Sequence, residues 1–171
     1  EAWYSRITID DVIQLVGKDA ALVGRVKKRI SEASKRTSEH VFQKITAPAK
    51  GLPRIVDQPP LLYHVSKQKL SERELAAFFK RYRDTLPEER RILFDRYQVV
   101  DLAIKVVGVG SVGTRCLVAL LLASPDDALF LQLKEARPSV LEPYTRQRVA
   151  HNGQRVVIGQ RLMQSASDIF L

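Results

Sequence analysis

The sequence predicts an α+β fold, in which a helical N-terminal part is followed by a small antiparallel sheet with a helix packed on it. Three observations predict this class. Apolar residues recur every three or four positions over the first hundred residues, aliphatic runs broken by Gly, Ser, Pro and Asp follow, and a helical pattern returns near the C-terminus. We place a boundary near residue 99, which separates a helical region at 1–98 from a glycine-containing sheet and helix at 99–171.

The first predicted element is one long amphipathic helix that ends before Pro48. Its apolar stripe has helical spacing and consists of Leu22, Val26, Ile30, Ala33, Thr37, Val41 and Ile45. The opposite face is basic and carries Arg25, Lys28, Arg29, Lys35 and Arg36. Because no aromatic residues interleave with these charges, as base stacking would require, we do not expect nucleic acid as a partner.

A proline-rich connector or extended segment is expected at 47–60, because its prolines forbid a continuous helix. The following "LLYHV" is compatible with a short strand. Two helices come next. Ser71 and Glu74 form a capping-box pattern ahead of "LAAFFKRY", and Thr85 and Glu88 repeat the pattern ahead of "RRILFDRY".

The sheet is predicted from three aliphatic stretches, "IKVVGVG", "CLVALLLA" and "ALFLQLKEA". A helix is then predicted over "GQRVVIGQRLMQSA". The residues expected on its inner side are Val156, Val157, Gln160, Leu162 and Met163.

Composition limits the classes of function. The 171 residues are 45% hydrophobic and carry 28 Lys and Arg against 19 Asp and Glu, a formal net charge of +9. This charge suits phosphate groups or another anionic partner, although a solvated basic face is the simpler explanation. The single cysteine, Cys116, excludes an internal disulfide framework, and we expect it to be a small buried hydrophobe. The three separated histidines give no zinc spacing.

Targeting signals are not evident in the sequence. No apolar run reaches the roughly 18 residues that a membrane helix needs, and no signal-peptide pattern opens the chain. We therefore expect a cytoplasmic protein without membrane contact. Because the chain opens on Glu1 and ends on the apolar "DIFL", we also expect a piece of a longer polypeptide, whose remainder is a partner of this segment.

The stretch "VVGVGSVGTRC" places Gly108, Gly110 and Gly113 in a G-x-G-x-x-G spacing, which has three interpretations. In a Rossmann unit, "SVGTRCLVALLLA" would be a helix, and Glu135, 22 residues after Gly113, would bind a ribose. Against this stands a run of seven apolar residues where a surface helix should alternate. In a plain hairpin, the glycines would bind nothing.

In the third, kinase-like interpretation, the glycines lie in the turn of a hairpin, and a tight turn at "SPDDA" leads to a third strand that ends at Lys134. Glycines let the backbone approach a triphosphate closely, and a lysine at the end of an inner strand pairs with its phosphates. Arg115 departs from the kinase pattern, which favours Val at that position. A strand at 117–123 would exclude the Rossmann unit, and a helix there would exclude the kinase-like one.

A family resemblance supports the kinase-like interpretation. The blocks "VVGVGSVGTRC", "LFLQLKEARPSVLEPY" and "GQRLMQSASDIFL" resemble the bacterial domain of unknown function 2252 family, closely over 99–171 and more loosely over the helical part. That family resembles the protein kinase and aminoglycoside phosphotransferase superfamily. The resemblance implies ATP binding with Mg²⁺ and phosphoryl transfer to an unknown acceptor.

The resemblance also implies roles for particular residues. Gly108, Gly110, Ser111 and Gly113 would form the phosphate loop, and Lys134 would pair with phosphate. The glutamate partner of such a lysine would be Glu142, with Gln160 as a neutral stand-in. The acidic catalytic and metal-binding motifs of the family do not lie in this segment, so we expect the segment alone to be inactive.

The alternatives are a dinucleotide-binding oxidoreductase fragment and a non-enzymatic interaction module. We expect His151 to lie in a turn or at the start of a helix. Asp168 could be a functional residue or could cap the next structural element.

Overall fold

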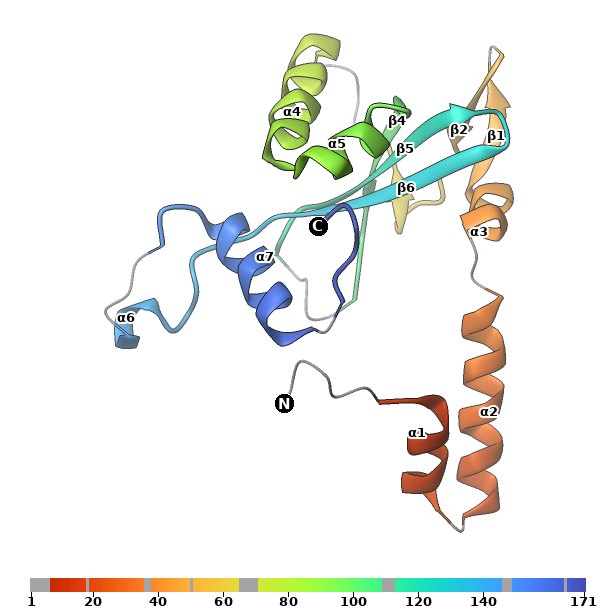
Figure 1. Cartoon of the computed structure of the whole chain (residues 1–171). Coiled ribbons are helices and arrows are strands. Elements are labelled where there is room, and N and C mark those ends of the chain that lie inside the picture. The colour runs from red at the N-terminus through yellow and green to blue at the C-terminus, as the bar shows by residue number, and fades with distance from the viewer. Residues whose placement is uncertain are drawn as a thin grey trace.

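The computed structural model describes residues 7–17, 19–35, 38–49, 51–64, 71–108, 113–145, 149–164 and 166–171. Within these ranges the chain forms seven helices and two small antiparallel sheets, which confirms the predicted α+β class (Figure 1). The helices are α1 (Ile9–Val16), α2 (Ala20–Ser34), α3 (Ser38–Ile45), α4 (Glu72–Thr85), α5 (Glu88–Phe94), α6 (Glu142–Thr145) and α7 (Asn152–Met163). The strands are β1 (Thr46–Ala49), β2 (Leu52–Ile55), β3 (Leu62–Tyr63), β4 (Gln98–Lys105), β5 (Cys116–Ser124) and β6 (Asp127–Lys134).

The larger sheet has the strand order β3-β4-β5-β6, and every neighbouring pair is antiparallel. The glycine segment connects β4 to β5, and a tight turn at 125–126 connects β5 to β6. The continuous apolar run of β5 is explained by its central position, because a strand covered on both faces needs no polar alternation. Of the residues from Cys116 to Leu122 in β5, all are buried except Leu117, which is half-buried.

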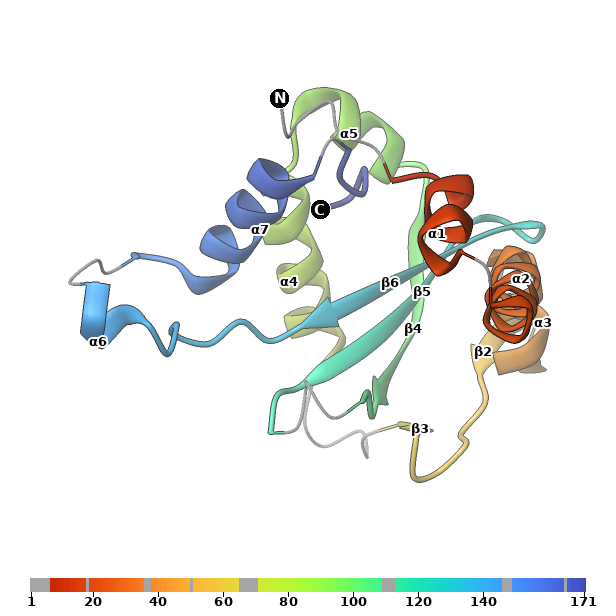
Figure 2. The ribbon, with the colours of Figure 1, turned by 90° about the horizontal axis from the view of Figure 1, so that it is seen from below.

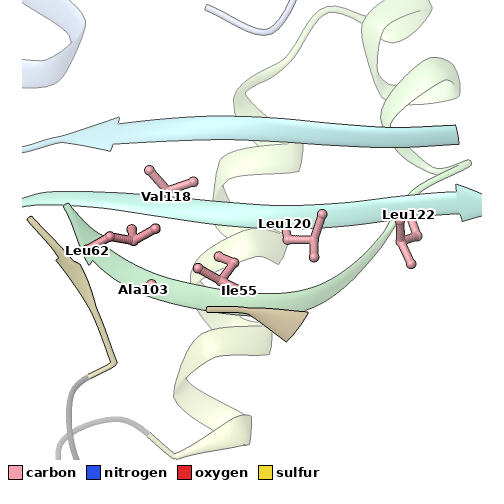
Figure 3. Close-up of a cluster of buried hydrophobic side chains, with 6 residues drawn as sticks. All are labelled: Ile55, Leu62, Ala103, Val118, Leu120 and Leu122. Atoms are coloured by element: carbon pink, nitrogen blue, oxygen red, sulfur yellow. The ribbon is translucent and has the colours of Figure 1, made fainter. Parts of the chain in front are cut away.

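Successive side chains of β5 point to opposite faces of the sheet, and each face has its own core. On one face Val118, Leu120 and Leu122 pack with Ile55 of the β1–β2 hairpin (Figure 3), together with residues of α3. On the other face the apolar side chains of α4 and α5 pack against Ala119 and Leu121. The sheet is therefore the middle layer, with α4 and α5 on one side and the β1–β2 hairpin and α3 on the other.

The predicted long helix is present as two helices, so its continuity was wrong. The carboxylate of Asp19 accepts hydrogen bonds from the backbone N–H groups of Ala21 and Leu22 and begins α2. After α2 ends at Ser34, α3 begins at Ser38 and ends at Ile45, before Pro48 as predicted. Residues 36–37 of the predicted stripe and basic face lie outside the described residues.

The proline-rich segment is extended, as its composition allows. Its first part forms the β1–β2 hairpin, which turns at Gly51 with φ +86°, a conformation that favours glycine. The "LLYHV" stretch supplies β3, which pairs with β4. The predicted boundary near residue 99 stays a prediction, and this pairing crosses it.

The predicted helices α4 and α5 are present, but only the first has the predicted cap. Ser71 and Glu74 form a capping box at the start of α4. The Thr85 cap was wrong, because the Thr85 hydroxyl donates to the Tyr82 carbonyl inside α4 at 2.6 Å. Helix α5 instead begins after Pro87, without a side-chain cap.

Helix α7 forms where predicted, with His151 as its cap, but its predicted inner side was wrong. Val156, Leu162 and Met163 are 37%, 55% and 86% exposed. Its apolar residues are spread around the helix and make no single stripe, whereas α4 and α5 present aromatic side chains that fill the sheet face. The helices packed on this face of the sheet are therefore α4 and α5, and α7 is not among them.

Candidate functional site

The glycine segment joins two antiparallel strands at one end of the larger sheet. Ile104 near the end of β4 is paired with Leu117 of β5, so the two strands that residues 106–115 connect in the chain form an antiparallel pair. Residues 117–123, predicted as a helix by the Rossmann interpretation, lie within β5 and pair with β4 and β6. The strand-helix-strand unit of that interpretation is therefore not formed here.

Two of the four predicted phosphate-loop residues lie in the described part of this segment. Gly113 has φ +78°, a conformation that side chains rarely adopt, which explains a glycine at this position. A Cβ added at the exposed Gly108 would meet no atom within 4 Å, so the space beside its backbone is open. Gly110 and Ser111 lie outside the described residues.

The C-terminal arm of the glycine segment, residues 113–115, is held by two charged residues that follow β6. Arg137 donates through Nη2 to the carbonyl oxygen of Gly113, and the backbone N–H of Arg115 donates to Oε2 of Glu135 at 2.9 Å. Arg155 of α7 donates in turn to the carbonyl oxygen of Arg137 at 2.8 Å. The hydrogen bond from the Arg115 amide and the nearby charge of Arg137 lower the pKa of Glu135. Glu135 and Arg137 therefore fix this arm, a role that sequence analysis missed because it pairs residues 24 apart.

Lys134 lies at the same end of the sheet as the glycine segment. It is the last residue of β6 and is paired with Cys116, the first residue of β5. The Lys134 side chain is exposed and forms no ion pair within the described structure. Alternation along β6 places it on the face of Phe130, which is the face of the β1–β2 hairpin. The expectation of an inner strand was wrong, because β6 is an edge strand of the described sheet.

The structure does not bring Glu142 to Lys134. Glu142 begins α6, where its Oε1 accepts a hydrogen bond from the backbone N–H of Ser139 at 3.3 Å. Both Figure 1 and Figure 2 show α6 away from the sheet, at the far end of the segment that follows β6. Gln160, the alternative partner, is exposed on α7.

Cys116 and Asp168 have local roles. Cys116 is 3% exposed, as predicted for a small hydrophobe, and its sulfur accepts a hydrogen bond from Gln132 Nε2 at 3.2 Å. The carboxylate of Asp168 accepts a hydrogen bond from the backbone N–H of Phe170 at 2.8 Å, which favours the capping interpretation.

A buried carboxylate on β4, which sequence analysis missed, is the centre of a second cluster. The Asp101 side chain is 4% exposed and accepts hydrogen bonds from the Ile55 N–H at 2.8 Å and from Arg54 Nη1 at 3.0 Å. Its Oδ2 also lies 3.1 Å from Nε2 of His64. Asp101 therefore ties β2 and the segment after it to β4. A charged residue inside the apolar stretch "VVDLAI" was the available signal.

His64 lies between two carboxylates. Its Nδ1 is 2.6 Å from Oδ1 of Asp57, and its Nε2 contacts Asp101. Burial lowers the pKa of His64, but the hydrogen bonds and charges of Asp57 and Asp101 outweigh this effect and raise the pKa above its usual value. For Asp101, burial raises the pKa, while the Ile55 amide, His64 and Arg54 together lower it. Charged His64 and ionised Asp101 thus stabilise each other.

We also searched the described residues for metal-ligand clusters and membrane-spanning helices. None of the described Asp, Glu, His and Cys side chains form a group of three that could hold a metal ion. Nor does any helix in the described ranges have the length and apolar content to cross a membrane. The predicted cytoplasmic location stays a prediction.

The fold and the candidate site define a mixed α+β protein. At one end of its central sheet lie the glycine segment and Lys134, which forms no ion pair with the described residues. The chain belongs to the DUF2252 family, which is described as an uncharacterised protein conserved in bacteria, and matches that family over residues 1–171. Neither a curated protein nor a solved structure matches the chain. Membership of the family predicted from the sequence is therefore confirmed, while the likeness to protein kinases stays an expectation.

Proposed function

We propose that this chain contributes the ATP phosphate-binding loop and lysine of a kinase-like phosphotransferase. The observation that carries the proposal is the placement of the glycine segment between two antiparallel strands, with Lys134 at the same end of the neighbouring strand. In a kinase-like lobe, backbone N–H groups of such a loop approach the triphosphate, and a strand lysine pairs with its oxygens. Gly108, Gly110, Ser111 and Gly113 would supply the loop.

Free positive charge at the loop end of the sheet supports a phosphate ligand. Lys105 ends β4 and Lys134 ends β6, and neither side chain forms an ion pair within the described residues. Both are expected on the same face, because each continues the alternation of the β1–β2 side. A triphosphate with Mg²⁺ would meet two uncompensated ammonium groups there. A pair between Lys134 and Glu142 would require the segment after β6 to fold back, and it forms no part of the proposal.

The chain alone is expected to bind nucleotide without transferring phosphate. Phosphoryl transfer also needs carboxylates that hold the metal ions and a residue that orients the acceptor. Near the loop, Glu135 is already bonded to the Arg115 amide and to Arg137. Without metal-based stabilisation of the transition state, positioning alone forfeits the largest catalytic contribution.

The test is the melting temperature of the chain with ATP and Mg²⁺, with NAD, and without nucleotide. Saturation at 100 times the dissociation constant stabilises a protein by about 2.7 kcal/mol, which is readily measured. Lys134→Met should weaken ATP binding by about 10- to 100-fold, because a charged hydrogen bond contributes roughly 1.5–3 kcal/mol. Lys27→Met is the matched control, because Lys27 on α2 is also exposed and forms no ion pair within the described residues. A larger shift with NAD than with ATP, or an unchanged ATP affinity of folded Lys134→Met, would refute the proposal.

A further inference from the structure

Helices α1 and α2 pack side by side, away from the central sheet (Figure 1). An open apolar groove is lined by residues of both helices. The groove has a volume of about 470 Å³. Its apolar wall on α1 includes Ile9 and Val12, and its wall on α2 includes Leu22, Val26 and Ile30. These positions follow helical spacing, so the groove runs along both helices.

Several apolar side chains that line the groove are exposed to solvent. Ile7 is 81% exposed, Ile9 54% and Leu22 39%. Among the described residues, neither α1 nor α2 contributes a side chain to the two cores of the larger sheet. A contiguous exposed apolar surface of this kind is typical of an interaction site.

Two arginines give the groove a charge. Arg25 and Arg29 line it together with the apolar residues and lie one helical turn apart on α2. Within the described residues no carboxylate pairs with either guanidinium. Of the two acids of α1, Asp11 is bonded to Thr8 in the capping box, and Asp10 makes no ion pair there. The groove therefore combines an apolar floor with two uncompensated positive charges.

We propose that the groove between α1 and α2 binds an acidic amphipathic helix of a partner protein. A helix can place apolar residues at i, i+3, i+4 and i+7 into such a groove, and carboxylates on its flanks would reach Arg25 and Arg29. A second copy of this chain would bring another basic α2 against the first, which like-charge repulsion disfavours. The proposal is independent of nucleotide binding, since the groove shares no residue with the glycine segment.

The experiment uses the whole chain and two labelled peptides of about 20 residues, a length that forms several helical turns. Both carry leucines at i, i+3, i+4 and i+7, and the flanking residues are Glu in one peptide and Lys in the other. Fluorescence anisotropy gives the affinity for each. The double variant Arg25→Glu and Arg29→Glu reverses the groove charge, whereas Lys27→Glu with Lys28→Glu reverses two charges of α2 that do not line the groove. Ile9→Ser removes groove surface, and Leu15→Ser removes an apolar side chain that is 84% exposed outside it.

The acidic peptide should bind at least about tenfold more tightly than the basic one, and charge reversal at Arg25 and Arg29 should invert this preference. The Lys27 and Lys28 control should retain it. Ile9→Ser should weaken the acidic peptide, and Leu15→Ser should not. Four results would overturn the proposal: no binding of either peptide, equal binding of both, self-association of the chain that Ile9→Ser abolishes, or preferential binding to phosphatidylserine vesicles that needs the same arginines. Circular dichroism of each variant confirms that its helices are retained.

Discussion

Replacing Asp101 by Asn tests whether the buried carboxylate holds the β1–β2 hairpin on the sheet. The substitution keeps the shape of the side chain and removes its charge. In the folded protein the carboxylate accepts from the Ile55 amide, Arg54 and the Leu102 amide and faces His64. An amide group offers one oxygen to these donors and turns an N–H₂ group toward another donor, so at least one contact must be lost.

The magnitude follows from the exposure of the partners. Breaking a buried pair typically costs about 3–5 kcal/mol, because a charge is left buried without compensation. Here the Arg54 side chain is 54% exposed and that of His64 35%, so water can solvate both when Asp101 is neutral. The loss then comes mainly from weaker hydrogen bonds to the carboxylate position, which gives about 2–3 kcal/mol. For a chain of this size that is a fall in melting temperature of about 4–12 °C.

The assay is urea unfolding at pH 7, combined with amide hydrogen exchange to locate the effect. Asp84→Asn is the matched control. It makes the same change of charge, but at an exposed ion pair with Lys80, so it should alter stability little. Faster exchange should be concentrated at the Ile55 amide, which loses a charged acceptor. If Asp101→Asn changed the free energy of unfolding no more than Asp84→Asn does, with exchange at Ile55 unaltered, Asp101 would not be the anchor that its contacts indicate.

Two further predictions concern the charged groups around this anchor and the glycine segment. The folded-state pKa of His64 is raised above 6.5, so the contribution of His64 to stability should be complete below pH 6.5 and be lost as the pH rises through the folded-state pKa. His64→Gln should remove this pH dependence from unfolding titrations. A pH dependence that His64→Gln leaves intact would assign it to another group. Arg137→Ala should speed hydrogen exchange at the Arg115 amide with little change in melting temperature, whereas Arg81→Ala, an exposed arginine on α4, should leave that amide unchanged. Equal protection of the amide in both variants would show that Arg137 does not hold the loop.

Local patterns predicted the elements because each depends on residues close in sequence. The apolar run 117–123 was assigned to a strand rather than a helix because a surface helix should alternate apolar and polar residues, and because the family resemblance favoured the hairpin. The Ser71 and Glu74 pair located the start of α4. The Thr85 pair failed because that hydroxyl can bond backward to Tyr82 as well as forward, and a proline start needs no side-chain cap.

Contacts between distant segments set the parts that could not be predicted. The choice of α4 and α5 over α7 as the cover of the sheet depends on which aromatic side chains reach it. Phe94 of α5 packs edge to face with Tyr82 of α4 and with Phe170, at ring centroid distances of 5.3 and 5.9 Å. Three partners of Asp101, namely Arg54, Ile55 and His64, lie 37 to 47 positions earlier in the chain. No periodicity in the sequence encodes such separations.

The two arms of the glycine segment are anchored by different parts of the molecule, and this bears on how a ligand could act through it. The N-terminal arm begins at Val106, whose N–H donates to the Leu61 carbonyl at 2.8 Å. This arm is therefore attached to β4 and to the segment between β2 and β3, which the contacts of Asp101 and His64 hold in place. The C-terminal arm is held by Glu135 and Arg137 after β6. A ligand that bridges both arms would therefore stabilise β4 and β6 together, because its binding free energy would be lost when either arm is released. Asp101→Asn should then weaken nucleotide binding through the first arm and Arg137→Ala through the second, although neither residue is proposed to contact the nucleotide.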